Sequence, residues 1–359
     1  MRNIAAESCR CGGRLAARRA PRGPGAEPLQ IAVGVICDAS GDRVLLARRR
    51  PGTQHAGLWE FPGGKCRPGE RFEDALRREL LEETDVAVES VEPLVCIDHA
   101  YPQVAVRLHV WRIARWHGAA RGREGQEVEW VPVGELRRRT FPEANRAIVS
   151  ALTLPALYVI TPDIDAYDAD FLALASSVLG AGAKLIQFRS TRLAEPERAR
   201  ILARLVELCG TTGARLMVNG SITEVLGSGA RGMHLTSSRL LQANERPLDP
   251  GHLIGASCHN RMELEHAERL GLDFAVLGPV RRTRTHPDVE PLGWRRFRNL
   301  AGRAGLPVYA LGGITPADLE TARRNGAHGL AMIGGIWSAE DPAAAVAACV
   351  RFFPQSLRD

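Results

Sequence analysis

The stretch GLWEFPGGKCRPGERFEDALRRELLEETDV, from Gly57 to Val86, decides how the first half of the chain is interpreted. It places a pair of glycines before a segment that we expect to be helical within residues 72 to 84. Glu79, Glu82 and Glu83 stand at i, i+3 and i+4, so such a helix carries all three carboxylates on one face. An acidic helix face is often merely solvated. Hard divalent cations, which prefer oxygen ligands, would offset the like-charge repulsion, so the face also fits metal-assisted hydrolysis of a diphosphate.

The context of this helix favours the metal interpretation. Gly63 and Gly64 lie just upstream, where backbone without a Cβ can approach a ligand closely, and Arg78 can pair with a carboxylate of the helix. The stretch resembles the Nudix box, G-x5-E-x7-R-E-U-x-E-E-x-G-U with U an aliphatic residue. The matching positions are Gly64, Glu70, Arg78, Glu79, Leu80, Glu82, Glu83 and Val86. Asp85 replaces the glycine of the box, and we expect a small stability cost with intact chemistry.

The resemblance implies a role for each matching side chain. Glu70 would support the loop and the helix, and Arg78 would orient the carboxylates that take part in catalysis. The implied cofactor is Mg2+, with Mn2+ as an alternative. The implied metal ligands are Gly64, Glu79, Glu82, Glu83 and, on the GREGQ loop, Glu124.

The likeness to the 8-oxo-dGTP diphosphatase branch of the Nudix family extends over roughly residues 30 to 152. The segments QIAVGVI, LLARR, LWEFPGGK, GREGQEVEW and FPEAN recur in that branch in the same order. By resemblance, Asn145 reads the oxidised purine, since its amide can both donate and accept, although it could simply end a helix. Arg49 would contact the substrate and Phe61 would line the base pocket. The branch's Asp-Arg pair beside that pocket is Gln103-Val104 here, which puts selectivity for 8-oxoguanine in question.

The order of patterns predicts two domains after an N-terminal extension. Residues 1–28 are rich in Arg, Ala, Gly and Pro and are expected to be disordered or a misassigned start, with an organelle transit peptide as the alternative. Residues 29–152 alternate strands with helices as an α+β Nudix fold, a mixed sheet between helices. Residues 155–353 hold eight short β-type runs with helical segments between them, which predicts an α/β (β/α)8 TIM barrel. An open doubly wound sheet would give the same alternation.

The second half resembles thiamine phosphate synthase and its relative, the TenI-like thiazole tautomerase. The markers are LIQFR, MVN, IGASCH, LGPVRRTRTH and YALGGIT, in this order. The resemblance implies binding of a phosphorylated ligand, with thiazole phosphate and thiamine phosphate as candidates, although glycines near strand ends can also be purely structural. The expected substrate-binding residues are Arg189, Asn219, Ser257, Thr283, Thr285, Gly312, Gly313, Gly334 and Gly335.

The barrel departs from the synthase pattern at the positions that hold magnesium. Thr191 replaces a lysine, while Gly220 and Arg239 replace the two aspartates. An arginine there would repel the metal, so we expect synthase activity to be doubtful. His259 aligns with the proton-transfer histidine of the tautomerase and suits general acid/base work. A tautomerase and a silent ligand-binding barrel both remain open.

Composition narrows the class of protein. Hydrophobic residues make up 45% and charged residues 25% of the 359-residue chain, and no apolar run is long enough to span a bilayer. The formal charge of +6 is spread along the chain, so we expect no direct nucleic-acid binding. Scattered cysteines indicate reduced thiols in the cytoplasm. The function predicted is hydrolysis of 8-oxo-dGTP to 8-oxo-dGMP and diphosphate, which serves DNA repair and replication fidelity; the alternative is hydrolysis of thiamine-related diphosphates.

Overall fold

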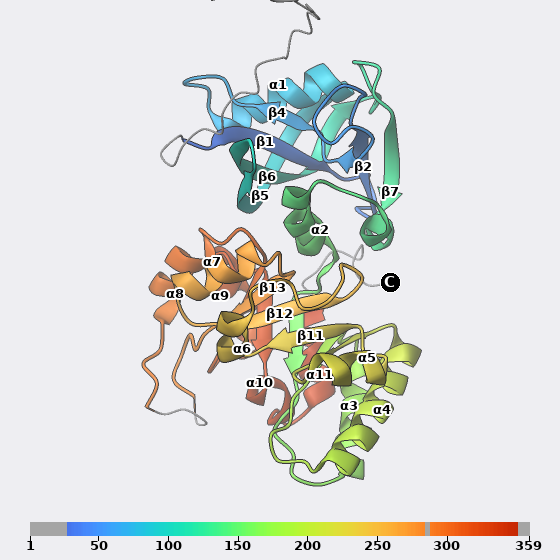
Figure 1. The fold of residues 1–359 in the computed structure, drawn as a ribbon, viewed down its shortest axis with the longest axis vertical. Coiled ribbons are helices and arrows are strands. Elements are labelled where there is room, and N and C mark those ends of the chain that lie inside the picture. The colour runs from blue at the N-terminus through green and yellow to red at the C-terminus, as the bar shows by residue number, and fades with distance from the viewer. Residues whose placement is uncertain (1–26, 284–287, 351–359) are drawn as a thin grey trace, which may run out of the picture.

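The computed structural model describes residues 27–283 and 288–350, and it places two bodies end to end along the long axis of the molecule (Figure 1). The first body is an α+β fold with a mixed sheet, and the second is a closed barrel of eight parallel strands. Both predicted fold classes are therefore confirmed, and the open-sheet alternative is wrong. In the described part of the chain, no helix is long and apolar enough to cross a membrane.

The first body contains two small sheets, with strand orders β4-β1-β6-β5 and β3-β2-β7. Strands β1 and β6 pair in parallel, whereas the other pairs are antiparallel. Its elements are β1 (Leu29–Ile36), β2 (Arg43–Arg48), β3 (Trp59–Glu60), β4 (Gly63–Lys65), α1 (Phe72–Thr84), β5 (Val86–Tyr101), β6 (Val104–Gly118), β7 (Val128–Pro132), the 3-10 helices η1 (Val133–Arg138) and η2 (Glu143–Asn145), and α2 (Arg146–Thr153).

Helix α1 is held against β1 by its apolar side. Leu76 and Leu80 are fully buried, and a Cβ added to Gly34 of β1 would come within 2.6 Å of Leu80 Cδ1, so the glycine permits this close approach. The helix ends at Asp85, whose φ of 59° is left-handed. Arg121 pairs with the Asp85 carboxylate at 2.9 Å. Asp85 thus adopts the conformation that a C-terminal glycine usually provides.

The barrel closes in the order β10-β11-β12-β13-β14-β15-β8-β9. Its interior is filled by large side chains, among them Tyr158, Phe274 and Tyr309, which pack edge to face or tilted against one another. Its elements are β8 (Leu157–Ile160), α3 (Ala169–Gly180), β9 (Leu185–Phe188), α4 (Glu195–Thr212), β10 (Arg215–Val218), α5 (Ile222–Ser228), β11 (Gly232–Leu235), α6 (Ser237–Gln242), β12 (Leu253–Cys258), α7 (Arg261–Arg269), β13 (Phe274–Leu277), α8 (Gly293–Ala301), β14 (Val308–Leu311), η3 (Pro316–Asp318), α9 (Leu319–Arg324), β15 (Gly329–Met332), α10 (Gly334–Trp337) and α11 (Pro342–Val350).

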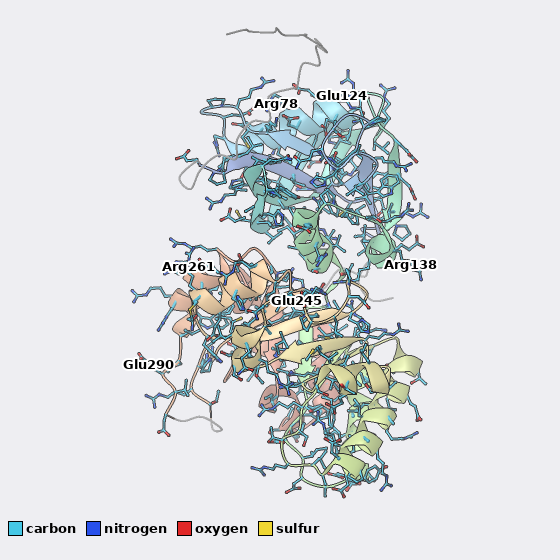
Figure 2. All side chains as sticks on the ribbon, viewed as in Figure 1. Arg78, Glu124, Arg138, Glu245, Arg261 and Glu290 are labelled. Carbon is cyan, nitrogen blue, oxygen red and sulfur yellow. The ribbon has the colours of Figure 1, made fainter. Side chains whose placement is uncertain are left out.

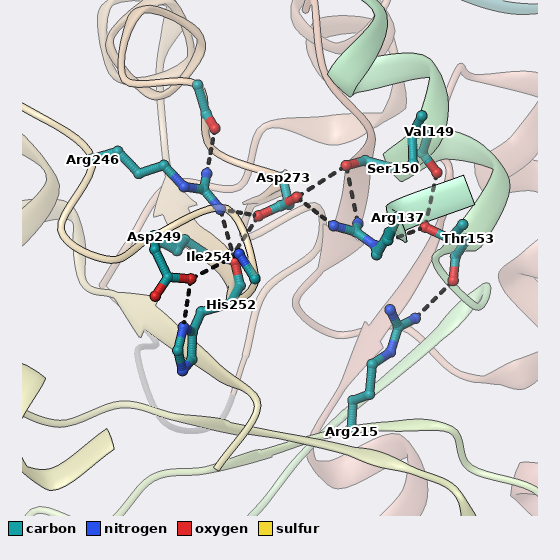
Figure 3. Close-up of polar contacts among 12 residues, drawn as sticks. Arg137, Val149, Ser150, Thr153, Arg215, Arg246, Asp249, His252, Ile254 and Asp273 are labelled. Carbon is teal, nitrogen blue, oxygen red and sulfur yellow. Dashed lines mark hydrogen bonds and ion pairs between the residues drawn. The ribbon is translucent and has the colours of Figure 1, made fainter. Parts of the chain in front are cut away.

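A buried carboxylate joins the two bodies (Figure 3). Asp273, 1% exposed, accepts from Arg137 of the first body at 3.0 Å and from Arg246 of the barrel at 2.7 Å. Ser150 Oγ of α2 donates to the same carboxylate at 3.1 Å. Although burial opposes ionisation, the two guanidinium groups and their hydrogen bonds keep the pKa of Asp273 below its usual value. The contact between the two bodies at Asp273, called the Asp273 joint below, thus consists of a buried carboxylate with a partner from each body. Such a paired charge favours one relative geometry of the two bodies.

The joint sits at the amino-terminal ends of the barrel strands. Asp273 precedes β13, Arg215 opens β10 and donates to Thr153 O at 2.7 Å, and His328 precedes β15 and bonds Leu154 O at 3.0 Å. Active sites of such barrels lie at the opposite, carboxyl-terminal face. The first body therefore covers the closed end of the barrel and leaves the mouth facing away from it (Figure 1).

Candidate functional site

The acidic face of α1 is organised by one arginine. Arg78 donates to Glu70 through Nε and Nη2, each at 2.8 Å, and its Nη1 lies 2.6 Å from Glu79 and 3.4 Å from Glu82. The hydrogen bonds from Arg78, with one from the Arg67 backbone, lower the pKa of Glu70 to about 2. Glu70 is thus an anion that binds Arg78 through two hydrogen bonds, while Arg78 also contacts two carboxylates of the face.

The glycine pair brings backbone against these carboxylates. Gly63 N donates to Glu83 Oε2 at 3.2 Å, and a Cβ added to Gly64 would lie 2.2 Å from the carboxylate carbon of Glu79. Gly63 also has a φ of 151°, and a Cβ there would meet Ala32 O at 2.1 Å. Gly63 therefore requires glycine, while Gly64 leaves room for the Glu79 carboxylate, and both place peptide groups directly beside the acidic face.

The Glu83 carboxyl is poorly hydrated beside the glycine pair. Burial, followed by the nearby carboxylates of Glu60, Glu79 and Glu124, raises its pKa to about 7 despite the bond from Gly63. Several carboxylates therefore lie close to a carboxyl group that is poorly hydrated. Carboxylate oxygens with unmet charge fit a hard divalent cation, which would be held by Glu79, Glu82, Glu83, Glu124 and the Gly64 backbone.

The side chains expected to bind a cation lie near one another but do not form a ready cation site. Within the part of the chain that the structure describes, no three His, Cys, Asp or Glu side chains form a ready cation cluster. Arg50 holds Glu124 at 2.8 Å, and Arg78 holds Glu79 and Glu82. The arginines thus occupy carboxylate oxygens that a cation would use, and Figure 2 places Arg78 and Glu124 on the end of the molecule remote from the barrel.

Two stacked aromatic rings lie beside the strand that precedes the glycine pair. Phe61 is buried and stacks on Phe141, with ring centroids 5.7 Å apart. Arg49 binds Glu60 from the neighbouring strand. Burial raises the pKa of the Glu60 carboxyl although Arg49 opposes the shift. The residue pair Arg49 and Phe61 was expected here, whereas Glu60 was missed; its place between Trp59 and Phe61, directly before the glycine loop, was the available signal.

Asn145 lies at the end of η2, where its side chain makes no capping hydrogen bond to α2. The neighbouring Ala144 N approaches Tyr101 Oη at 3.4 Å, and Tyr101 packs on His55 and His99. The amide of Asn145 is thus not used as a helix cap. Gln103 is exposed in the turn between β5 and β6, so the sequence change there alters a surface turn.

The barrel mouth gathers part of the expected phosphate site. Gly312 and Gly313 have left-handed φ values of 102° and 62°, and a Cβ at either would lie within 2.6 Å of neighbouring atoms. A Cβ at Gly335 would lie 2.6 Å from Ile314 O, while Gly334 opens α10. Close packing therefore accounts for three of these glycines even without a ligand. Thr285 lies outside the described residues.

Two polar side chains of the mouth, Ser257 and His259, form hydrogen bonds within the protein. Ser257 Oγ bonds His234 Nε2 at 2.9 Å, and Tyr158 Oη bonds the other ring nitrogen at 3.1 Å. Burial lowers the pKa of His234 to about 3, so this imidazole is neutral. His259 Nδ1 bonds Gly278 O at 2.7 Å, so this ring is oriented by the end of β13.

The position of the absent aspartate is filled from another element. A Cβ added to Gly220 would lie 1.8 Å from Glu224 Oε2. Glu224 is paired with the largely buried Arg198, whose Nη2 lies 3.1 Å from Oε2. Arg239 donates to Gly220 O. A carboxylate is therefore present where the sequence pattern lacks one, and an arginine neutralises it.

Fold and sites define a class: a diphosphate-hydrolase-like α+β domain joined to a phosphate-binding (β/α)8 barrel. The model of the family described as thiamine monophosphate synthase matches residues 157–336, and the NUDIX domain model matches residues 28–152. The chain belongs to the thiamine monophosphate synthase family and carries an N-terminal NUDIX domain.

Two relatives and one structure illustrate the match. A putative thiamine-phosphate synthase 2 from Aquifex aeolicus is 31% identical and covers 51% of this chain and 97% of its own. A thiamine-phosphate synthase from Chromobacterium violaceum is 35% identical, covering 55% and 95%. A MutT structure from work on Aliivibrio salmonicida and Vibrio cholerae is 30% identical, with a TM-score of 0.32, covering 35% and 97%.

Proposed function

We propose that the Nudix domain hydrolyses 8-oxo-dGTP to 8-oxo-dGMP and diphosphate, using Mg2+. The observation that carries the proposal is the acidic face of α1 packed on Gly63 and Gly64, with Glu83 at a pKa of about 7. Water adds at phosphorus, the bridging P–O bond breaks and the monophosphate leaves. Bound Mg2+ would neutralise phosphate charge and acidify a water.

The residues of this chain divide the work. Arg78, fixed by Glu70, holds Glu79 and Glu82 in place before a cation arrives. Glu83, whose pKa is raised by burial, can take a proton from water in its carboxylate form. The partly buried Phe141, stacked on the buried Phe61, would offer an apolar face to a base, and the uncapped amide of Asn145 would offer a donor and an acceptor to its edge.

The test is to give the whole protein 8-oxo-dGTP, dGTP and a thiamine-related diphosphate in Mg2+ and to compare kcat/KM. The proposal requires 8-oxo-dGTP to be the best substrate. A higher kcat/KM for the thiamine-related diphosphate would instead support the alternative function.

We propose second that the barrel is catalytic, because its relatives carry the name thiamine-phosphate synthase. This replaces the expectation that synthase activity is doubtful. Glu224 would serve as the carboxylate that Gly220 cannot provide, after exchanging Arg198 for a cation. Magnesium-dependent formation of thiamine phosphate from a pyrimidine diphosphate and thiazole phosphate is the reaction to test, and a tautomerase or a silent barrel would give none.

A further inference from the structure

The connection between the two domains passes directly from one hydrophobic core into the other. Leu152, near the end of α2, is buried in the core of the Nudix domain. Leu154 is fully buried in the cluster that fills the barrel, together with Tyr158 and Tyr309. Thr153 alone separates the two leucines, whereas domains that move independently are usually joined by an exposed, flexible linker. The connection is therefore part of both cores.

Three successive carbonyl groups of this connection accept hydrogen bonds from barrel side chains. The pairs are Arg215 Nη2 to Thr153 O at 2.7 Å, His328 Nε2 to Leu154 O at 3.0 Å, and Tyr309 Oη to Pro155 O. Thr153 ends α2, and the last carbonyls of a helix have no partner within it. A cation at this end also meets the negative end of the helix dipole. The barrel thus caps the last helix of the Nudix domain.

The barrel depends on the same hydrogen bonds. Within the described residues, the Arg215 guanidinium forms no hydrogen bond or ion pair except the one to Thr153 O. Burial, followed by the nearby charge of Arg137, lowers the pKa of Arg215 to about 10. Tyr309 is fully buried, so its hydroxyl needs the Pro155 carbonyl. Loss of the connection would leave a poorly hydrated cation and a buried hydroxyl without partners, which opposes folding.

Arg137 links this connection to the Asp273 joint (Figure 3). Its Nη1 lies 3.0 Å from Asp273 Oδ1 in the barrel, while its Nε donates to Thr153 Oγ1 at 3.1 Å. One side chain of the Nudix domain therefore holds both the end of α2 and the buried carboxylate of the barrel. Separation of the domains would break all of these contacts together.

We propose that the connection Thr153–Pro155 and the Asp273 joint make the two domains one cooperative folding unit, so that neither domain stays folded when the other unfolds. The proposal follows from the exchange of partners, since polar groups of each domain are satisfied by the other. In such a unit, a ligand bound to either folded domain would protect both from unfolding.

The test is urea unfolding of the full-length protein, followed by a short pulse of thermolysin and electrophoresis of the fragments. The wild-type chain should disappear in a single transition, without a surviving fragment of the size of either domain. Arg215→Met removes the charge and the donors but keeps an apolar stem. It should lower the first midpoint by about 1 M urea, as expected for the loss of a charged hydrogen bond, and leave a domain-sized fragment above that midpoint.

The matched control is Arg204→Met, because Arg204 is exposed on α4 and pairs with Glu207 of the same helix. It should keep the wild-type transition. Arg215→Lys, which retains a cation and a donor, should shift the midpoint less, and it provides the same comparison if Arg215→Met does not fold. A domain-sized fragment that survives over a range of urea concentrations in the wild type would overturn the proposal. Equal midpoints in the Arg215 and Arg204 variants would also overturn it.

Discussion

The Nudix site and the barrel mouth both combine carboxylates with arginines, but their charge balance differs. In the Nudix site, burial and then three nearby carboxylates raise the pKa of Glu83 to about 7. In the barrel, Glu224 is matched by Arg198 in a close ion pair. The comparison teaches that the charge left unneutralised around a carboxylate, and not its mere presence, prepares a site for a cation.

The largest effect is expected on kcat, from removing the charge of Glu83. Glu83→Gln should lower kcat for 8-oxo-dGTP by at least about a hundredfold, as expected for a general base or metal contact. Steady-state kinetics in Mg2+ with circular dichroism as a check of folding measure it. Glu73→Gln, on the exposed first turn of α1, is the matched control and should retain activity. More than about a tenth of wild-type kcat in Glu83→Gln would contradict this role.

The next largest effect is expected in the barrel, where the Glu224 carboxylate is paired with Arg198. Glu224→Gln should lower magnesium-dependent thiamine phosphate formation about ten- to a hundredfold, because it removes the carboxylate beside Gly220. The exposed Glu207→Gln, which disturbs only the Arg204 pair on α4, is its control. Product formation is followed by chromatography. Undiminished synthesis in Glu224→Gln, or none in the wild type, would break the proposed equivalence with a metal-binding aspartate.

How far the sequence predicts these sites depends on whether the residues share one regular element. The α1 face was predictable because Glu79, Glu82 and Glu83 share one helix, where spacing determines direction. Glu224 was not, because Gly220 lies in the connection before α5, so helical spacing does not determine where the Glu224 carboxylate lies relative to Gly220. The Asp273 joint was equally hidden, since its partners Arg137 and Arg246 come from different domains.

An effect of intermediate size is expected on stability, because the raised pKa of Glu83 makes the free energy of unfolding depend on pH. In metal-free protein Glu83 has a pKa of about 7, above the ordinary 4.5, so the unfolded state releases its proton first and stability falls as pH rises between these values. Glu83→Gln should therefore be more stable than the wild type by about 2 to 3 kcal/mol at pH 8 and nearly equal at pH 4. Urea unfolding in EDTA at several pH values measures this difference. The transition of the Nudix domain is first identified as the one that Mg2+ shifts. A constant difference across pH would show that Glu83 ionises normally.

The smallest expected effect concerns base recognition, which the proposed function assigns to Asn145. Asn145→Ala should reduce the preference for 8-oxo-dGTP over dGTP only several-fold, because one neutral hydrogen bond is worth about 0.5 to 1.5 kcal/mol. Since the Asn145 side chain caps no helix, stability should barely change. The ratio of the two kcat/KM values measures the effect, and the exposed Gln103→Ala, in the β5–β6 turn, serves as control. Equal losses for both nucleotides would assign Asn145 to structure, and the pocket's selectivity would then have to come from Glu60 and Arg49.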